Sequence, residues 1–223
     1  MSLLLALDAS TSSIMVGLYR ADSGQELETL VAPGARGDTL PEMFRQILSN
    51  SGASAHDVSR LACGVGPGSF TGIRAALAAA QGLAFRRQLP VAGVSTLLAA
   101  LSHPTLEAQT GRTRIALLDA YREEAFARAL APGQSAVSGA GSDVRIGRDA
   151  VAGLSPEAIV LWHGRDAQGI PDFALGLMDF LLPSGIARLS LAGSCGEPVP
   201  NYLREAAPVE ALLAQGRTLP PLS

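Results

Sequence analysis

The 223-residue chain is 48% hydrophobic and 17% charged, with a formal net charge of -3 and a sequence pI near 5.6. This length suits one large domain or two lobes, and the weak negative charge argues against autonomous nucleic-acid binding, which usually needs a basic face. Cys63 and Cys195 lie far apart, which predicts reduced thiols. The apolar run Leu3–Leu7 is too short for a signal peptide or a membrane span, so we expect a cytoplasmic protein.

The first half of the chain alternates short apolar runs with turns and amphipathic segments. Leu3–Leu7 is typical of a buried strand, and the polar residues 8–13 predict a turn before the next apolar run. Residues 41–49 have helical periodicity with Pro41 near the first turn. The expected elements are strands at 3–7, 14–19, 26–31, 61–65 and 89–94, and helices at 41–49, 73–85 and 95–101.

A loop at residues 64–72 holds four glycines and one proline between a predicted strand and a predicted helix. Such a loop is typical of an anion site at a helix N-terminus or of a rigid corner. It is not a Walker A loop, because no Lys-Ser or Lys-Thr follows it. Ser69 or Thr71 could cap the helix beside a bound anion, whereas Gly66 and Gly68 could simply supply positive φ angles. The sequence leaves both interpretations open.

The predicted helix at 73–85 is built mostly of alanine and glycine. Small side chains let another helix approach closely, so the pattern indicates either a partner interface or a tightly packed internal helix. Arg74 lies in the first turn, where the helix dipole disfavours a cation. A bound anion or a carboxylate partner would offset that cost.

The second half of the chain begins with a short sequence repeat of the first half. Residues 115–120 resemble residues 4–9, since both are apolar runs that end in Asp-Ala, at Asp8 and Asp119. The repeat predicts two lobes, 1–106 and 107–223, in an α/β fold. The two aspartates could handle a metal and phosphate across a cleft, or could close their own turns. Further on, we expect strands at 125–130 and 157–162, a loop or irregular strands at 132–147, a helix at 173–182 and a poorly ordered tail at 214–223.

No constellation of catalytic residues emerges from the spacing. The three histidines are scattered, no pair has metal-ligand spacing, and no nucleophile elbow is present. A bound zinc or iron ion is therefore not expected.

Several blocks of the chain resemble the TsaB (YeaZ) family, the bacterial accessory subunit for tRNA threonylcarbamoyladenosine synthesis. In this sequence Asp119-Ala120-Tyr121 replaces the family's Asp-Ala-Arg, and Phe126 replaces its usual tyrosine. The similar blocks lie at 64–74, 80–84 and 90–97, with further similarity at 5–11, 119–126 and 197–204.

The resemblance implies a two-lobed fold of the actin-like ATPase and sugar-kinase superfamily. It implies a non-catalytic scaffold that forms a homodimer or binds the transferase TsaD, together with the ATPase TsaE, and reaches tRNA only through that complex. ATP and a metal would act in the partner subunits, and this chain would need no cofactor. The implied interface lies on the helices at 41–49 and 72–85, with these residues: Met43, Phe44, Ile47, Ile73, Ala76, Leu77, Ala80 and Leu83.

The alternative is a nucleotide-dependent phosphotransferase of the same fold. In that hypothesis the first aspartate and the Gly/Pro loop surround ATP and magnesium. In the scaffold hypothesis the same residues form at most a vestigial nucleotide or anion site. The candidate residues are Asp8, Ser10, Thr11, Gly66, Gly68, Ser69 and Thr71.

Overall fold

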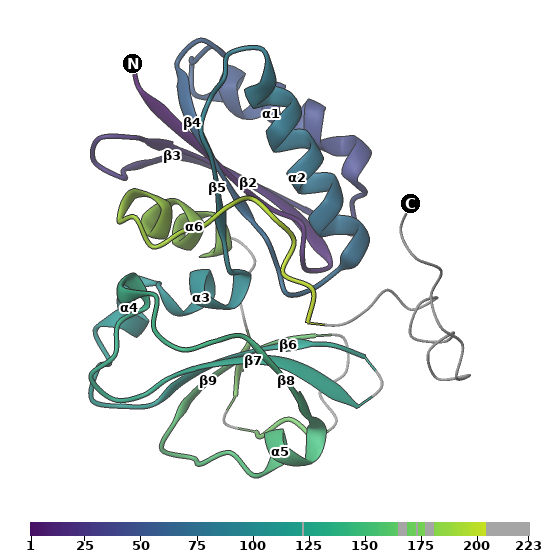
Figure 1. Ribbon diagram of the computed structural model, residues 1–223, viewed down its shortest axis with the longest axis vertical. Helices are drawn as coiled ribbons and strands as arrows, with labels where there is room; N and C mark the ends of the chain where they lie inside the picture. Colours follow the sequence, from purple (N-terminus) through teal and green to yellow (C-terminus); the bar gives the residue numbers. More distant parts are fainter. Residues whose placement is uncertain (122, 165–168, 173, 177–180, 204–223) are drawn as a thin grey trace.

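The chain folds into two lobes, each built around a mixed five-stranded sheet (Figure 1). The computed structural model describes residues 1–203 apart from 122, 165–168, 173 and 177–180. Helices α3 (Thr96–Leu101) and α6 (Leu181–Leu191) lie between the two sheets. Helices α1 (Leu40–Asn50) and α2 (Phe70–Phe85) pack on the other face of the first sheet. The predicted α/β class is confirmed.

The first sheet has the strand order β3-β2-β1-β4-β5. Its strands are β1 (Leu3–Asp8), β2 (Ser13–Arg20), β3 (Glu26–Pro33), β4 (Val58–Gly64) and β5 (Val91–Val94). β1 pairs antiparallel with β2 and parallel with β4. Leu3, Leu5 and Leu7 belong to the core beneath α1 and α2, whereas Leu4 and Ala6 belong to the core with α3 and α6. Because both faces of β1 are covered, its sequence is an unbroken apolar run.

The second sheet repeats this arrangement as β8-β7-β6-β9-β10. Its strands are β6 (Arg114–Asp119), β7 (Glu124–Leu130), β8 (Val144–Gly147), β9 (Ile159–His163) and β10 (Leu175–Gly176). β6 pairs antiparallel with β7 and parallel with β9, so it occupies the position that β1 has in the first sheet. The repeated Asp-Ala motif therefore marks equivalent strands, as the sequence predicted.

The short helices complete the connections. They are η1 (Gly37–Thr39), α4 (Pro104–Glu107), η2 (Ala136–Ser138) and α5 (Arg148–Ala152). The range 132–147, expected to be a loop or irregular strands, contains η2 and the short strand β8. The helix expected at 173–182 is wrong at Leu175–Gly176, which form β10, whereas Leu181 and Leu182 belong to α6 (Leu181–Leu191).

The division at residue 106 stays a prediction. Although α6 belongs to the second half of the sequence, it packs against β1 and β2 of the first lobe. The tail expected at 214–223 and parts of the 173–182 range lie outside the described residues. Among the helices that the structure describes, none is both long and apolar enough to cross a membrane.

Candidate functional site

The Asp8 carboxylate lies at the carboxyl end of β1 and is completely buried. Its Oδ1 atom accepts hydrogen bonds from the backbone N–H and the hydroxyl of Ser10, both at 2.7 Å. Its Oδ2 atom accepts one from the Thr96 hydroxyl, also at 2.7 Å. These hydrogen bonds join the first hairpin to the start of α3. In each of them the acceptor is the buried Asp8 carboxylate and the donor belongs to this chain.

The Gly/Pro loop packs directly on the turn that carries Ser10. A Cβ atom at Gly68 would overlap the Ser10 carbonyl, and one at Gly64 would overlap the Asp8 carboxylate. The Ser69 N–H donates to the Ser10 carbonyl at 2.7 Å. The predicted positive φ angles are confirmed at Gly66 (92°) and Gly68 (152°). The glycines thus serve the close approach of two backbone segments, which is the rigid-corner interpretation.

The candidate nucleotide or anion residues are only partly brought together. Ser10 contacts Asp8, Gly68 and Ser69, and the Ser69 hydroxyl caps α2 by accepting from the Gly72 N–H at 3.2 Å. The remaining candidates differ in position, since Gly66 is buried in the loop, Thr11 bonds locally to Ser13, and Thr71 is exposed on α2. An anion at this corner stays a prediction.

The neighbourhood of Asp8 also holds a thiol. Burial, and secondarily the negative charge of Asp8, raise the pKa of the Cys63 thiol well above its usual range. Cys63 is fully buried and therefore behaves as a small apolar side chain. Among the described residues, no group of three or more His, Cys, Asp or Glu side chains could hold a metal ion.

The second aspartate has a different environment at the equivalent strand end. Asp119 Oδ1 accepts from the Tyr121 N–H at 3.0 Å and pairs with the Arg148 guanidinium at 3.2 Å. That guanidinium also lies over the Trp162 ring, 4.8 Å from its centroid. Asp119 therefore closes its own turn and anchors the start of α5.

The predicted interface residues face the core of their own lobe, which corrects the sequence interpretation. Only Leu83 is exposed, with 41% of its surface accessible. The apolar stripes of α1 and α2 pack into the core on this face of the first sheet. The buried residues are Met43, Phe44, Ile47, Ile73, Ala76, Leu77 and Ala80.

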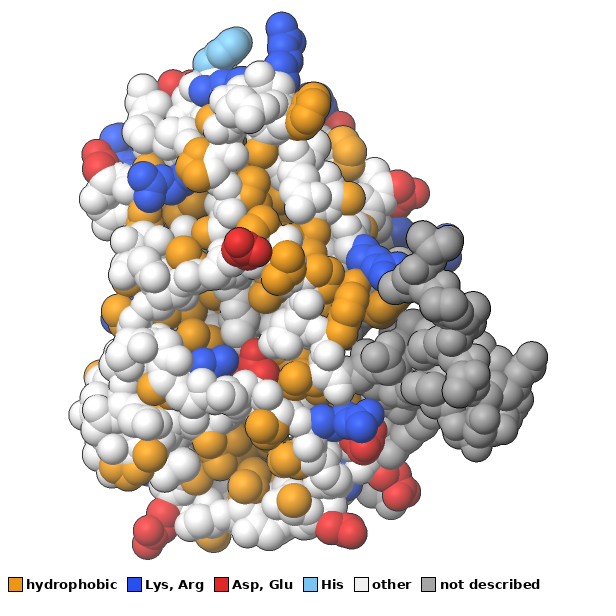
Figure 2. Space-filling view, in the orientation of Figure 1, with side chains coloured by type: hydrophobic (Ala, Val, Ile, Leu, Met, Phe, Trp, Pro, Cys, Tyr) orange, Lys and Arg blue, Asp and Glu red, His pale blue; other side chains and the backbone are white. Residues whose placement is uncertain are grey.

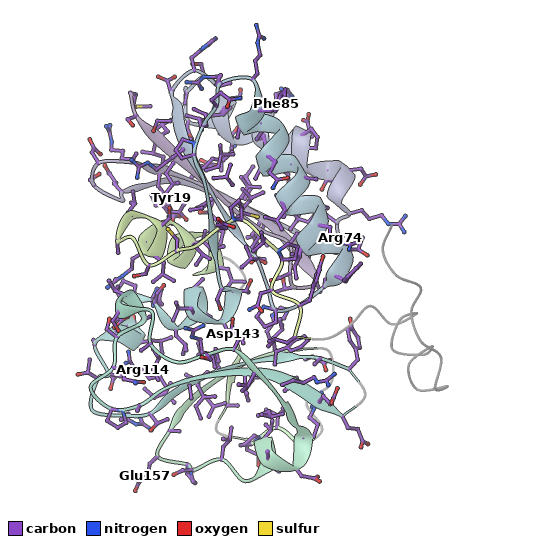
Figure 3. The ribbon with its side chains drawn as sticks, viewed as in Figure 1. Tyr19, Arg74, Phe85, Arg114, Asp143 and Glu157 are labelled. Carbon is purple, nitrogen blue, oxygen red and sulfur yellow. The ribbon has the colours of Figure 1, made fainter. Side chains whose placement is uncertain are left out.

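The exposed side of α2 lies on a face of the first lobe where hydrophobic side chains reach the surface (Figure 2). Figure 3 labels its two ends, Arg74 and Phe85, and Phe85 is 78% exposed. Between them lie the small residues Ala78 and Gly82. Arg74 packs on the Phe70 ring at 3.9 Å and donates to the Tyr202 hydroxyl at 2.8 Å. Aromatic contacts thus accompany this cation, which lies in the second turn because α2 begins at Phe70 and not at residue 73 as expected.

Sequence reasoning missed Thr96, Arg148 and the glycines opposite the two aspartates. Thr96 follows the residue that caps α3, so a helix start was its only visible signal. Gly164 lies beside Asp119 as Gly64 lies beside Asp8, at the carboxyl end of the neighbouring parallel strand. A search for glycines at the ends of the two parallel strands could have found this pair.

Two lobes with the same mixed strand order and helices packed between them define a two-lobed α/β protein with a repeated architecture. Residues 35–150 match the family model described as "TsaD: tRNA N6-adenosine threonylcarbamoyltransferase". The solved structure of YeaZ from Pseudomonas aeruginosa is 30% identical, with a TM-score of 0.70 over 91% of this chain and 100% of that one. The chain belongs to the TsaB/YeaZ family.

Curated relatives support this membership over shorter segments. Two of these relatives are named "tRNA threonylcarbamoyladenosine biosynthesis protein TsaB". The Haemophilus influenzae protein is 38% identical over 123 residues, which is 55% of this chain and 51% of the relative. The Escherichia coli protein is 30% identical over 167 residues, 75% of this chain and 61% of the relative. The matches thus span about half to three fifths of the length of these relatives.

Proposed function

We propose that this protein is a non-catalytic accessory subunit in the biosynthesis of tRNA threonylcarbamoyladenosine. It would act in the cytoplasm by binding the transferase TsaD, together with the ATPase TsaE, and would contact tRNA only through that complex. The similarity to YeaZ over nearly the whole chain carries the proposal. The names of the curated relatives support the assignment to this biosynthesis.

The geometry around Asp8 supports a role without chemistry of its own. All three hydrogen bonds described for its carboxylate come from inside the chain, and the Gly/Pro loop is filled by the turn at Ser10. A carboxylate that acts on a substrate or a metal must be able to reach it. We therefore assign ATP and the metal to the partner subunits and no cofactor to this chain.

The exposed side of α2 is the proposed contact with the transferase or with a second copy of this chain. Its small residues would let a partner helix approach closely, and its exposed Leu83 and Phe85 would supply apolar area. Gly82 is exposed and has open space where a side chain would begin. Residue 82 can therefore be enlarged without disturbing the core.

The test is restoration of tRNA threonylcarbamoyladenosine in bacterial cells that lack their own TsaB, measured by mass spectrometry of digested tRNA. We expect the intact chain to restore the modification and to co-purify with the transferase. Gly82→Arg should abolish both while leaving the circular dichroism spectrum unchanged. The matched control is Val144→Arg, which places the same charge on an exposed apolar position of the second lobe. Failure of the intact chain to restore the modification would refute the proposal.

The alternative phosphotransferase predicts nucleotide binding by the chain alone. Calorimetry with Mg-ATP distinguishes the two functions, since the scaffold should show no tight binding. Low-micromolar affinity would favour the phosphotransferase.

A further inference from the structure

The segment from Gly196 to Leu203, which we call the strap, runs from the end of α6 along the first lobe towards the second (Figure 1). Gly196 and Gly93 of β5 exchange two backbone hydrogen bonds, each 2.9 Å long. A Cβ atom at Gly93 would overlap the Glu197 carbonyl, so the strap lies tightly against the edge of β5. The strap thus acts as an additional partner of the first sheet.

Asn201 of the strap contacts both lobes. Its backbone N–H donates to the Val65 carbonyl in the Gly/Pro loop at 2.8 Å. Its side-chain amide donates to Oδ2 of Asp143 at 2.7 Å. Asp143 immediately precedes β8 of the second sheet, so one residue of the strap bridges the two lobes.

Asp143 lies between the two sheets, near α3 (Figure 3). Its Oδ1 atom accepts from the Ser95 hydroxyl of the first lobe and from Arg128 of β7, both at 3.0 Å. The side chains of Asp143 and Arg128 are only 5% and 8% exposed. Donors from three separate parts of the chain therefore meet on one buried carboxylate.

Arg128 is itself held firmly within the second lobe. Its guanidinium donates to the carbonyls of Gly139, Ala140 and Gly141 at 2.8 to 3.2 Å. Asp143 thus cannot follow the strap or Ser95 without breaking charge-assisted hydrogen bonds, which are stronger than neutral ones.

The end of the strap is attached to α2. The Tyr202 ring stacks on Phe70 with centroids 4.8 Å apart, and its hydroxyl accepts from Arg74. The strap therefore joins β5, the Gly/Pro loop, α2 and the second lobe in one continuous set of contacts.

We propose that the strap and Asp143 lock the two lobes at one fixed angle. Hinge motion between lobes is a common way for two-lobed proteins to respond to ligands. Here such a motion has to separate Ser95 and Asn201 from the buried Asp143–Arg128 pair. The protein is therefore a rigid body that holds α2 in a constant orientation to the second lobe. This inference stands independently of the proposed function.

The test measures the distance between spin labels on the two lobes by pulsed electron paramagnetic resonance. Labels are attached at Gln46→Cys in α1 and Glu157→Cys in the second lobe, which are exposed positions, in a Cys195→Ser background. We expect one narrow distance distribution for the intact lock. Asn201→Ala and Asp143→Ala should broaden and shift it.

The matched control is Asn50→Ala, which removes an amide-to-carboxylate hydrogen bond of 3.0 Å to Glu28 inside the first lobe. It should leave the distribution unchanged. If Asp143→Ala does not fold, Asn201→Ala decides the matter, because it leaves the Asp143–Arg128 pair intact. An unchanged distribution in folded Asn201→Ala would overturn the lock and assign the lobe angle to the packing of α3 on α6.

Hydrogen exchange gives a second readout. In Asn201→Ala the backbone N–H groups of residues 196 and 201 should exchange roughly ten- to a hundredfold faster, as expected when a hydrogen bond to a charged acceptor is lost. Unchanged exchange at both positions would contradict the inference, because the strap would then be held without the bond to Asp143.

Discussion

The two lobes share one strand order but use their equivalent aspartates in different ways. In both lobes the carboxylate accepts the N–H of the residue two positions later, Ser10 at 2.7 Å and Tyr121 at 3.0 Å. In the first lobe the other described donors are hydroxyls and the carboxylate has no exposed surface. In the second lobe an arginine stacked on Trp162 pairs with it near the surface. The turn is therefore a property of the topology, whereas the chemistry of each aspartate depends on its surroundings.

The largest difference between the lobes should come from removing each carboxylate. Asp8→Ala leaves three buried donors without their acceptor, so we expect a loss of about 4 kcal/mol in the free energy of unfolding. Asp119→Ala should cost less, about 2 kcal/mol, because the Asp119 and Arg148 side chains are 12% and 13% exposed and Arg148 keeps its contact with Trp162. Urea denaturation measures both. Equal losses would mean that burial does not distinguish the two turns.

The glycines opposite the aspartates test how tightly each turn is packed. Gly64→Ala would place a methyl group on the Asp8 carboxylate, and we expect a loss of about 3 kcal/mol. Gly164→Ala meets the side chains of Trp162 and Asp119, but Gly164 itself is exposed whereas Gly64 is buried, so a smaller loss of about 2 kcal/mol is expected. Thermal unfolding of the two variants gives the comparison. A larger loss for Gly164→Ala would reverse our ranking of the two turns.

A smaller effect of opposite sign is expected on α2, for which the described part of the second lobe has no counterpart after β9. Gly82→Ala should raise the free energy of unfolding by about 0.5 to 1 kcal/mol, since alanine favours the helix and meets no neighbour. The measurement is urea denaturation of the isolated protein. Destabilisation would show that Gly82 is needed by the fold and not by a partner.

The smallest expected effect is the pH dependence of stability that Cys63 causes, and Cys63 lies on the strand next to β1. Cys63 pairs in register with Leu7, where the second lobe has His163 paired with Leu118. Because the folded-state pKa of Cys63 is raised, its contribution to stability is complete below about pH 8.5, the ordinary thiol pKa, and is lost as the pH rises further.

Cys63→Ala should therefore lose less stability than the intact chain between pH 7 and pH 10. Urea denaturation across that range measures the difference in slope. The control is Cys195→Ala, which removes an exposed thiol and should keep the slope of the intact chain. Parallel slopes for Cys63→Ala and the intact chain would contradict the raised pKa.

Much of the fold could be predicted from local pattern, because strands buried on both faces have unbroken apolar sequences. The two Asp-Ala repeats located β1 and β6 correctly for this reason. The pattern could not say which side of α2 faces inward, since alanine is compatible with either side. It also could not reveal the Thr96 contact with Asp8 or the Asp143 junction, whose members are distant in sequence and meet only through the topology.

The late position of α6 in the chain has a consequence for synthesis on the ribosome. Leu182, Ile186 and Leu189 of this helix are buried in the core that includes Leu4 and Ala6 of β1. Until α6 has left the ribosomal exit tunnel, that face of the first sheet has no complete apolar cover. The first lobe therefore reaches its native packing only after residue 191 has left the tunnel, and a nascent chain that ends at residue 106 exposes a surface prone to aggregation.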